Sequence, residues 1–544
     1  MGCSSSSCFI SPRTSTIDEN ALKSVRFLEN CLVIWICNET RNRYAKEQEK
    51  LRKVIPALKI SHNLDTCLTY VSSMVDEKIF LIISGLSKPA EHFSQFERIY
   101  LFNPIDISNN PTTKYRNINE EILTDIDQLC EQLQNDLQLC EMDLISLTIV
   151  PGSSKDDAAF LFGQMTKEII FRWKFDSGAK DVLVDFCRRY YEHHPEQLSI
   201  IEDFAQNYRP HCALSWFRRP CFLSQILNRA LRTREVDVIY KFGFFIKHVN
   251  LQLNRLHNEN PLDMNKISFV YRGKTMLDEE FVHRLKNASG SFLSFPDFLL
   301  TNIHKRVAMD FIHRRLIHHP HRIGILFQIH IDPTIFSEKN PYALLKDIDQ
   351  DEICFHMETV FRIQSVEQTI ENSQSIWIIE LKSVNHDNPQ LISLTTSIQS
   401  DEMHANPELY LGKLLVDMGE YRRAEQVLLA LSEDPSVRRQ PRRLARAHHS
   451  LGLVYTYQNE HAKALDHYQQ LLQISLTYLQ PNHPDLSPIY QAIGNTYFSQ
   501  RKSQLAIENY EKALELSRYS IQPVSAEMLA DLSARIDEAK QWRE

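Results

Sequence analysis

Short apolar runs alternate with polar, helix-compatible segments in the first part of the chain. CLVIWIC begins at Cys31, and KIFLIISG and RIYLFNP follow it, with polar segments such as NRYAKEQEKLRKVI between them. Apolar strands separated by helices are typical of a parallel sheet with both faces covered. The pattern predicts a small doubly wound α/β domain over residues 28–148. No glycine-rich turn follows its first strand, so we expect a scaffold or partner-binding role for this domain.

Apolar residues at three- and four-residue steps replace this pattern from about Asp156 to His257. Segments such as AAFLFGQMTKEIIFRW and AKDVLVDFCRRYYEHH therefore predict a helical lobe over about 156–262. Strands take over after Pro261, where ISFVYRG, RIGILFQIHID, ICFHMETVFRI, IWIIEL and LISLTT follow one another. These runs predict a β core over about 266–396, so that residues 150–398 form one α+β domain.

The run RIGILFQIHID gives the clearest alternation in the chain. Ile325, Phe327 and Ile329 fall on one face of the predicted strand, whereas Leu326 and Gln328 fall on the other. Such alternation is typical of a half-buried antiparallel strand.

A helical pattern recurs three times within residues 402–544. Its glycines are Gly412, Gly452 and Gly494, separated by 40 (452 − 412) and 42 (494 − 452) positions. An alanine stands 12 positions after each glycine, and a large residue stands 16 positions after it: Ala424, Ala464 and Ala506, then Leu428, Tyr468 and Tyr510. The pattern resembles the tetratricopeptide repeat, with a spacing like that of kinesin light chains. The resemblance implies an array of helix pairs that binds a protein or peptide partner on its concave face.

Composition excludes several classes of protein. The chain has 544 residues and a net charge of −8, which argues against a nucleic-acid binder. None of its 11 cysteines forms a CxxC pair, so we expect buried, reduced thiols rather than a zinc site. No apolar run approaches 18 residues and no secretory signal opens the chain, so we expect a cytoplasmic protein.

The first residues form a serine-rich leader over 1–27. MGCSSSS fits the myristoylation pattern, with Gly2 exposed after removal of Met1, and Cys3 is placed for palmitoylation. Two acyl chains would hold the protein at the cytosolic face of a membrane. The alternative is a flexible leader in which this match is accidental.

Five histidines gather around HRRLIHHPHR. Their spacing is irregular and their neighbours are basic, which disfavours a bound cation; they are His304, His313, His318, His319 and His321. We expect a solvated basic turn here and no metal. The chain also lacks both GxGxxG and GxxxxGK[ST], the glycine loops that cradle phosphates.

Three segments of the β core carry candidate chemistry: VYRGKTM, SGSFLSFPDFLLTN and QDEICF, in that order. This order resembles the mono-ADP-ribosyltransferases of the Arg-Ser-Glu class, whose pattern is apolar-Tyr-Arg-Gly, Phe-x-Ser-Thr-Ser and x-x-Glu. Arg272, Ser294 and Glu352 match its three anchors. The similarity extends over residues 156–396 and includes NRALR at Asn228–Arg232.

The resemblance implies a reaction and its donor. NAD would be the substrate, with NADP as an alternative donor and no metal required. Glu352 would stabilise the positive charge that develops on ribose as nicotinamide leaves. Arg272 would pair with the pyrophosphate through its planar guanidinium, and Ser294 would orient neighbouring groups. A protein side chain would accept the ADP-ribose.

Two departures from the family pattern keep alternatives open. Ser294 is followed by Phe295 and Pro296 instead of Thr and Ser, and proline removes a backbone donor from that strand. Arginine-specific members carry a glutamate where this chain has Gln350, so arginine is the family's default acceptor but another acceptor is open. Each anchor alone also has an ordinary structural role, as a surface arginine, a small buried serine or a strand-edge glutamate. The alternative function is a decayed transferase that acts as an adaptor through its repeats.

Overall fold

The computed structural model describes most of the chain. It covers residues 30–37, 44–55, 57–72, 74, 78–84, 96–102, 120–150, 158–172, 175, 178–192, 194–219, 221–259, 267–332, 341–345, 351–371, 374–385, 388–395, 406–518 and 526–541. The predictions at Gly2, Cys3 and Gln350 fall outside this range.

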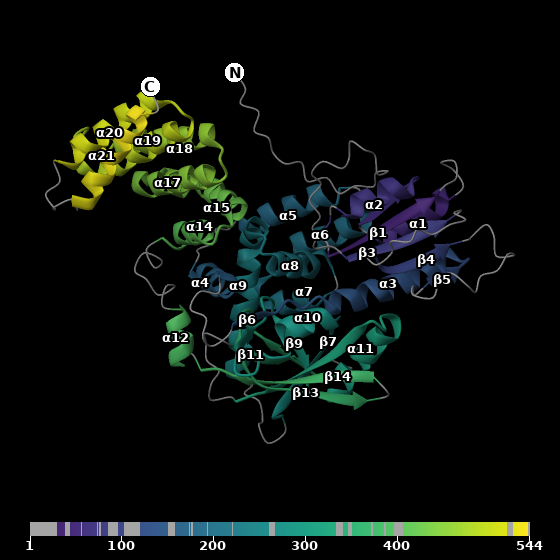
Figure 1. The fold of residues 1–544 in the computed structure, drawn as a ribbon. Coiled ribbons are helices and arrows are strands. Elements are labelled where there is room, and N and C mark those ends of the chain that lie inside the picture. Colours follow the sequence, from purple (N-terminus) through teal and green to yellow (C-terminus); the bar gives the residue numbers. More distant parts are fainter. Residues whose placement is uncertain are drawn as a thin grey trace. The chain divides into compact units, whose positions relative to one another are not determined.

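The chain divides into two compact units. The first contains residues up to 155 together with 170–391, and the second contains 156–169 together with 392–544. The first unit therefore holds both the α/β domain and most of the predicted α+β domain, and the second holds the repeats (Figure 1).

The N-terminal domain is a doubly wound parallel sheet, as predicted. Its strands are β1 (Cys31–Cys37), β2 (Leu58–Ser61), β3 (Lys78–Ser84), β4 (Phe96–Phe102) and β5 (Glu120–Leu123). They lie in the order β2-β1-β3-β4-β5 and every pair is parallel. Its helices are α1 (Ala45–Val54), α2 (Leu64–Ser72) and α3 (Ile126–Asp143). Helices α1 and α3 cover one face of the sheet, around Trp35, and α2 covers the other, around Ile34.

A helical lobe precedes all but the first strand of the second sheet. It contains α5 (Ala179–Tyr190), α6 (Pro195–Asn207), the short 3-10 helix η2 (Pro210–Cys212), α7 (Ala213–Arg218), α8 (Phe222–Thr233) and α9 (Val236–Glu259). The sequence between Ser224 and Leu256 is periodic throughout, but the structure divides it at Arg234, whose φ is 58°. Buried residues of this lobe pack against Phe298 and Cys354 of the second sheet, so that lobe and sheet share one core.

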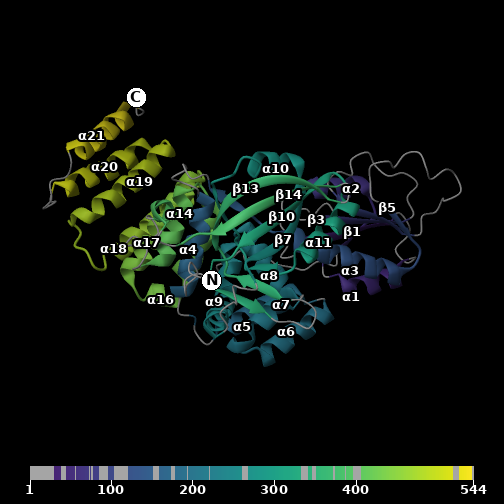
Figure 2. The same cartoon turned by 90° about the horizontal axis from the view of Figure 1, so that it is seen from below.

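The second sheet is mixed. Its strands are β6 (Thr148–Val150), β7 (Phe269–Leu277), β8 (Phe292–Ser294), β9 (Leu299–Asn302), β10 (Arg322–His330), β11 (Tyr342–Leu345), β12 (Glu352–Phe355), β13 (Val360–Glu371) and β14 (Gln374–Ser383). Their order is β11-β12-β9-β7-β10-β14-β13-β8-β6. Its helices are α10 (Asp278–Arg284) and α11 (Lys305–His318), and α12 (Pro389–Thr395) follows the last strand. Figure 2 shows the long strands β13, β14 and β10 side by side.

The central strand β10 has the predicted alternation of faces, but it is not the half-buried, antiparallel strand that was expected, because Leu326 on the second face is buried too. Ile325, Phe327 and Ile329 are fully buried on one face, whereas Leu326 packs against α11 on the other. The strand pairs antiparallel with β7 and parallel with β14. At Gly273 of β7, a Cβ atom would lie 2.5 Å from the carbonyl oxygen of Ala308 in α11. Glycine is therefore required after Arg272 because the backbone of the helix lies against the strand.

Two predicted strands differ from the structure. LISLTT was expected to be a strand, but its residues up to Thr395 lie in α12. The side chain of Asn388 starts this helix, because it accepts hydrogen bonds from the backbone N–H groups of Gln390 and Leu391 at 3.0 and 3.2 Å. Pro389 suits the first helical position. A backbone N–H at this position would have no acceptor within the helix, and proline has no N–H. ICFHMETVFRI is two strands rather than one, since the chain turns between Phe355 and Val360.

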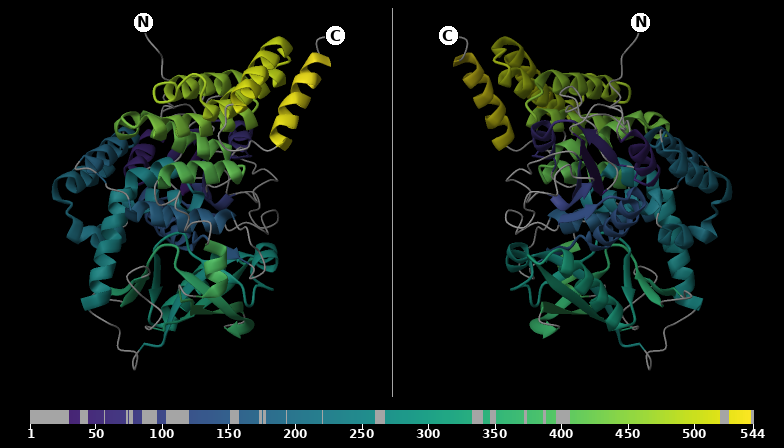
Figure 3. Two further views of the ribbon diagram at one scale, coloured as in Figure 1. Left: turned by 90° about the vertical axis from the view of Figure 1, so that its left-hand side faces the viewer. Right: turned by 90° about the vertical axis from the view of Figure 1, so that its right-hand side faces the viewer.

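The described residues of the second unit lie mainly in helices. They are α14 (Pro407–Asp417), α15 (Tyr421–Glu433), α16 (Pro435–Arg438), α17 (Pro441–Tyr457), α18 (His461–Ser475), the 3-10 helix η4 (Pro484–Leu486), α19 (Ser487–Ser499), α20 (Ser503–Ser517) and α21 (Ala526–Gln541), together with most of α4 (Ala158–Arg172). A Cβ atom at Gly452 would lie 2.3 Å from the ring of Tyr468. A Cβ atom at Gly494 would lie 2.7 Å from the ring of Tyr510. The predicted spacing of 16 residues thus marks the contact between the two helices of a pair. Figure 3 shows α14 to α21 in green and yellow.

The cysteines agree with the expectation of reduced thiols. Of the nine in the described residues, eight are buried and Cys212 is partly exposed, and none is in a disulfide. No helix in the described part of the chain has the length and hydropathy of a membrane span.

Candidate functional site

A polar cavity of about 610 Å³ lies in the first unit, where three parts of the chain meet. The end of α3 supplies Gln138, Glu141 and Met142. The helical lobe supplies side chains from α7, α8 and the segment between them: Ser215, Phe217, Arg218, Arg219, Ser224, Gln225 and Asn228. The mixed sheet and its loops supply Arg272, Asp297, Phe298, Leu299, Leu300 and Glu352. The volume is in the range of small-molecule sites, roughly 300–1,000 Å³.

Arg272 lies on β7 beneath this cavity. Its Nη2 donates to the carbonyl oxygen of Met142 at 2.7 Å, and its Nη1 is 3.4 Å from that of Leu300. Burial lowers the pKa of this guanidinium, whereas the carboxylates of Asp297 and Glu352 act in the opposite direction. The charge of Arg272 is thus held among backbone oxygens and acids at the floor of the cavity.

Glu352 opens β12 at the wall of the same cavity. Its Oε2 accepts from Nη2 of Arg218, the last residue of α7, at 3.1 Å. Both side chains are about one-quarter exposed, so the ion pair faces the cavity rather than the core. Arg272 and Glu352, which were selected from separate sequence segments, therefore line one site.

Ser294 has different surroundings. It is fully buried at the end of β8, and its hydroxyl donates to Oε2 of Glu358 at 3.0 Å. Glu358 itself lies in the turn before β13, with a φ of 56°. Ser294 is not among the described residues that line the cavity.

The segment that does reach the cavity begins three residues later. Asp297, Phe298, Leu299 and Leu300 line it, and Asn302 pairs with Glu352 across the β9–β12 ladder. Phe298 to Asn302 reads Phe-Leu-Leu-Thr-Asn, which has phenylalanine and threonine where the family pattern Phe-x-Ser-Thr-Ser has them. Leucine and asparagine occupy the positions of the two serines. The hydroxyl of Thr301 donates to the carbonyl oxygen of Ile353 at 2.9 Å, so it ties β9 to β12.

Several buried polar atoms around the cavity lack partners. Within the part of the chain that the structure describes, these are Oε1 of Gln225, Oδ1 of Asn228, Nε of Arg272 and Oδ1 of Asp297. Most buried polar groups in proteins are hydrogen-bonded, so atoms like these indicate a place for water or for a polar ligand. Three acceptors and one donor suit a ligand that carries hydroxyl, amide and anionic groups.

Asp297 is the acid at the floor of the cavity. Burial raises the pKa of its carboxyl to about 6, although the positive charge of Arg272 opposes the shift. The carboxyl therefore changes its charge close to neutral pH. Neither Asp297 nor Arg218 was selected from the sequence, because neither lies at a recognisable motif position.

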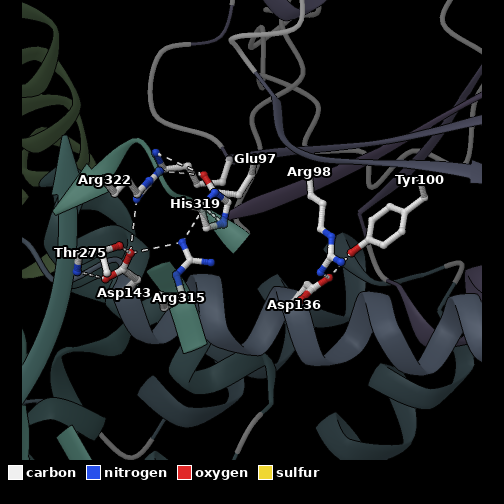
Figure 4. Close-up of polar contacts among 10 residues, drawn as sticks. Glu97, Arg98, Tyr100, Asp136, Asp143, Thr275, Arg315, His319 and Arg322 are labelled. Atoms are coloured by element: carbon white, nitrogen blue, oxygen red, sulfur yellow. Dashed lines mark hydrogen bonds and ion pairs between the residues drawn. The ribbon is translucent and has the colours of Figure 1, made fainter. Parts of the chain in front are cut away.

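An ion cluster beside the cavity joins the α/β domain to the mixed sheet (Figure 4). Glu97 of β4 pairs with Arg315 and Arg322 at 2.6 and 3.0 Å. Asp143, at the end of α3, lies 3.2 Å from Arg315 and 3.4 Å from Arg322. We call these four residues the ion cluster.

Within the histidine-rich segment, His319 differs from the expected solvated turn, whereas His304 and His321 are exposed. His319 is only 4% exposed, and its Nε2 lies 3.4 Å from Oε1 of Glu97 in the ion cluster. Burial lowers the pKa of His319 to about 3, so its ring is neutral near pH 7. The segment is thus part of the contact between the two domains of the first unit. No group of metal-ligating side chains gathers among the described residues.

Comparisons with known proteins identify the repeats. The tetratricopeptide repeat family model matches residues 443–518, which span α17 to α20. A search of curated proteins finds no match.

Several solved structures that resemble part of the chain are ADP-ribosyltransferase toxins. C3larvin from Paenibacillus larvae is 13% identical, with a TM-score of 0.23, over 34% of this chain and 92% of its own. The Vis toxin from Vibrio splendidus is 17% identical, with a TM-score of 0.20, over 41% and 92%. The enzymatic component C2-I of the Clostridium botulinum C2 toxin is 14% identical, with a TM-score of 0.22, over 34% and 46%. Likeness at this level supports no conclusion about activity.

Proposed function

We propose that the cavity binds NAD and that the protein transfers ADP-ribose from it to a protein side chain, with release of nicotinamide. The observation that carries this proposal is the position of Arg272 and Glu352 at one polar cavity. The unpartnered atoms of Gln225 and Asn228 add acceptors that suit a nucleotide's hydroxyl and amide groups. NADP is the alternative donor.

The two anchors have different tasks in this proposal. Cleavage of the nicotinamide–ribose bond leaves positive charge on the ribose, and the carboxylate of Glu352 stabilises that charge. The Glu352 carboxylate is held in place by the guanidinium of Arg218 at 3.1 Å. Arg272 supplies positive charge for the pyrophosphate, because its planar fork fits phosphate oxygens.

The acceptor is a protein side chain. Arginine is the default acceptor of the family that the motifs resemble. Gln350 stands where arginine-specific members have a carboxylate, and a neutral amide holds a guanidinium less well than a carboxylate does. Mass spectrometry of a lysate labelled with the enzyme and NAD would identify which side chain gains ADP-ribose.

The test of the enzyme activity is nicotinamide release from NAD. We expect Glu352→Gln to slow this release about 100-fold or more, because the amide cannot stabilise a cation. Glu202→Gln is the matched control, since Glu202 belongs to a surface ion pair with Arg188 and does not line the cavity. Equal release by the parent and Glu352→Gln proteins would remove Glu352 from catalysis.

A second candidate is a decayed transferase that acts as an adaptor through its repeats. Leu300 and Asn302, in place of two serines, and the contact of Arg272 with Met142 favour it. Calorimetry separates the two functions: binding at micromolar to millimolar NAD supports the enzyme, whereas no heat at millimolar NAD supports the adaptor. In either case the tetratricopeptide repeats would recruit a protein or peptide.

A further inference from the structure

The end of α3 lies where the proposed ligand would need to be. Arg272 Nη2 donates to the carbonyl oxygen of Met142 at 2.7 Å, in the last turn of that helix. The neighbouring Glu141 also lines the cavity, and its carboxylate accepts from Nε2 of Gln225 at 3.1 Å. The α/β domain thus reaches into the site of the α+β domain.

The charges at this helix end disfavour an anion. The carboxyl end of a helix carries a partial negative charge, because its last carbonyl groups have no partner within the helix. Glu141 adds a carboxylate. A pyrophosphate carries two negative charges, so it would be repelled by α3 and would compete with Met142 for Arg272.

Helix α3 is also held firmly within its own domain. The carboxylate of Asp136 binds Arg98 and accepts from the hydroxyl of Tyr100 at 2.5 Å, both on β4 (Figure 4). All three side chains are buried. The helix and the sheet of the α/β domain therefore move together.

The ion cluster fixes this domain against the mixed sheet. Oδ1 of Asp143 accepts from the backbone N–H of Thr275 at 2.5 Å, and the Asp143 carbonyl accepts from Nζ of Lys274 at 2.8 Å. Although burial disfavours its charge, Arg322 and Arg315 lower the pKa of Glu97 to about 2. The Glu97 carboxylate thus remains ionised and bound to both arginines near neutral pH.

We propose that the last turn of α3 is an autoinhibitory element, which the ion cluster holds over Arg272 and which must withdraw before the pyrophosphate of NAD can bind there. The proposal rests on the proposed function, since it concerns access to the same cavity. The alternative is that α3 is a permanent wall of the site, with Glu141 contacting the ligand. The two arrangements predict opposite responses of α3 to NAD.

Hydrogen–deuterium exchange of the full chain distinguishes them. With saturating NAD, we expect the amides of residues 138–145 to exchange at least about threefold faster, because the helix end leaves the cavity. Slower exchange in these amides would show a closed wall and would overturn the proposal, and so would unchanged exchange with NAD bound.

A variant of the ion cluster gives a second, independent test. Glu97→Gln removes a charge that holds the domain and leaves the cavity lining intact. We expect the Kd for NAD, measured by calorimetry, to fall at least about fivefold, because the open state becomes more populated. Asp143→Asn should act in the same direction and replaces Glu97→Gln if that protein does not fold.

The control is Glu202→Gln, the same chemical change at an exposed ion pair of α6. It should leave the Kd unchanged. If both ion-cluster variants bind NAD with the parent's affinity while Glu352→Gln still abolishes nicotinamide release, the autoinhibition is wrong and the proposed function stands. If no protein binds NAD at millimolar concentration, the proposed function fails and the inference fails with it.

Discussion

At the scale of single residues, the arginine at the cavity wall has the most direct consequence for the proposed chemistry. Arg218 binds Glu352 at 3.1 Å from a different part of the chain. A carboxylate that must stabilise charge on ribose needs a fixed position, and a planar guanidinium supplies it. The pair joins α7 of the helical lobe to β12 of the sheet, so orientation of the carboxylate depends on how lobe and sheet pack.

We predict that Arg218→Ala lowers kcat/KM for nicotinamide release about 10- to 100-fold, the usual cost of losing a hydrogen bond to a charged group. Arg218→Lys should restore part of the loss, because it keeps the charge but not the fork. Arg188→Ala, at an exposed ion pair, is the control. Equal rates for Arg218→Ala and Arg188→Ala would show that the ion pair does not contribute.

The buried histidine predicts a pH dependence of stability. The pKa of His319 is about 3 in the folded protein, below the usual value near 6.5, so the unfolded chain binds an extra proton between these pH values. The contribution of the neutral His319 ring to the free energy of unfolding is complete above pH 6.5. It is lost as pH falls toward 3, by up to about 1.4 kcal/mol per pH unit. Glu97 contributes in a lower range, since its pKa falls from 4.5 to about 2, so the two effects overlap only below about pH 4.5.

Denaturant unfolding of the parent and His319→Gln proteins at pH 7 and pH 5 measures this effect. We expect the parent to lose about 1–2 kcal/mol more than the variant over that interval. Identical losses in the two proteins would mean that His319 is not the titrating group.

The sequence pattern selected two residues that line the cavity, Arg272 and Glu352, but their roles in a reaction stay predictions. Arg272 and Glu352 could be selected because their segments follow one another in the order of the family pattern; Arg272 lies within β7 and Glu352 opens β12. Arg218 and Asp297 could not, because only the folded chain brings α7 and the β8–β9 turn to the cavity. Whether Ser294 takes any part in the reaction stays a prediction.

At the scale of elements, the spacing of apolar residues along the sequence predicted the strands and helices whose side chains form the core. Strand β1 and the alternation of β10 appear in the sequence as apolar runs, and they are buried as expected. The helix α12 was missed because Asn388 and Pro389 start a helix in a sequence that otherwise favours a strand. Local capping chemistry here outweighs side-chain propensity.

The close approach of α11 to β7 predicts a cost for any side chain at Gly273. In Gly273→Ala, the new Cβ would lie 2.5 Å from a backbone oxygen, which cannot move independently of its helix. We expect the free energy of unfolding to fall by about 1–3 kcal/mol. Glu367→Ala, at an exposed position of β13, should have little effect in the same denaturant experiment, and equal losses would contradict the packing argument.

At the scale of the whole molecule, the chain combines a proposed NAD site with tetratricopeptide repeats, for which we propose a protein or peptide partner. The fold classes of both units could be predicted from the sequence, because each depends on repeated patterns. The interdomain ion cluster could not, since Glu97, Arg315 and Arg322 carry no pattern that marks them as partners.

The acylated leader remains a proposal about where the molecule acts. We predict that Gly2→Ala moves the protein from the membrane fraction to the soluble fraction, because myristoylation requires that glycine. Cys3→Ser should weaken membrane binding but not prevent the first acylation, since one chain anchors only marginally. Immunoblots of fractionated cells measure both variants. An unchanged distribution of Gly2→Ala would exclude the anchor.

The short strand β6 limits how the protein can be divided. Only residues 144–147 separate it from α3, yet it pairs with β8 in the mixed sheet. A fragment that begins after Val150 would expose the edge of β8 that β6 covers, and an exposed strand edge is a site for aggregation. Expressed fragments of the α+β domain should therefore start before Thr148. For the same reason, a chimaera in which another domain replaces the α/β domain would have to keep residues 148–150 with the mixed sheet.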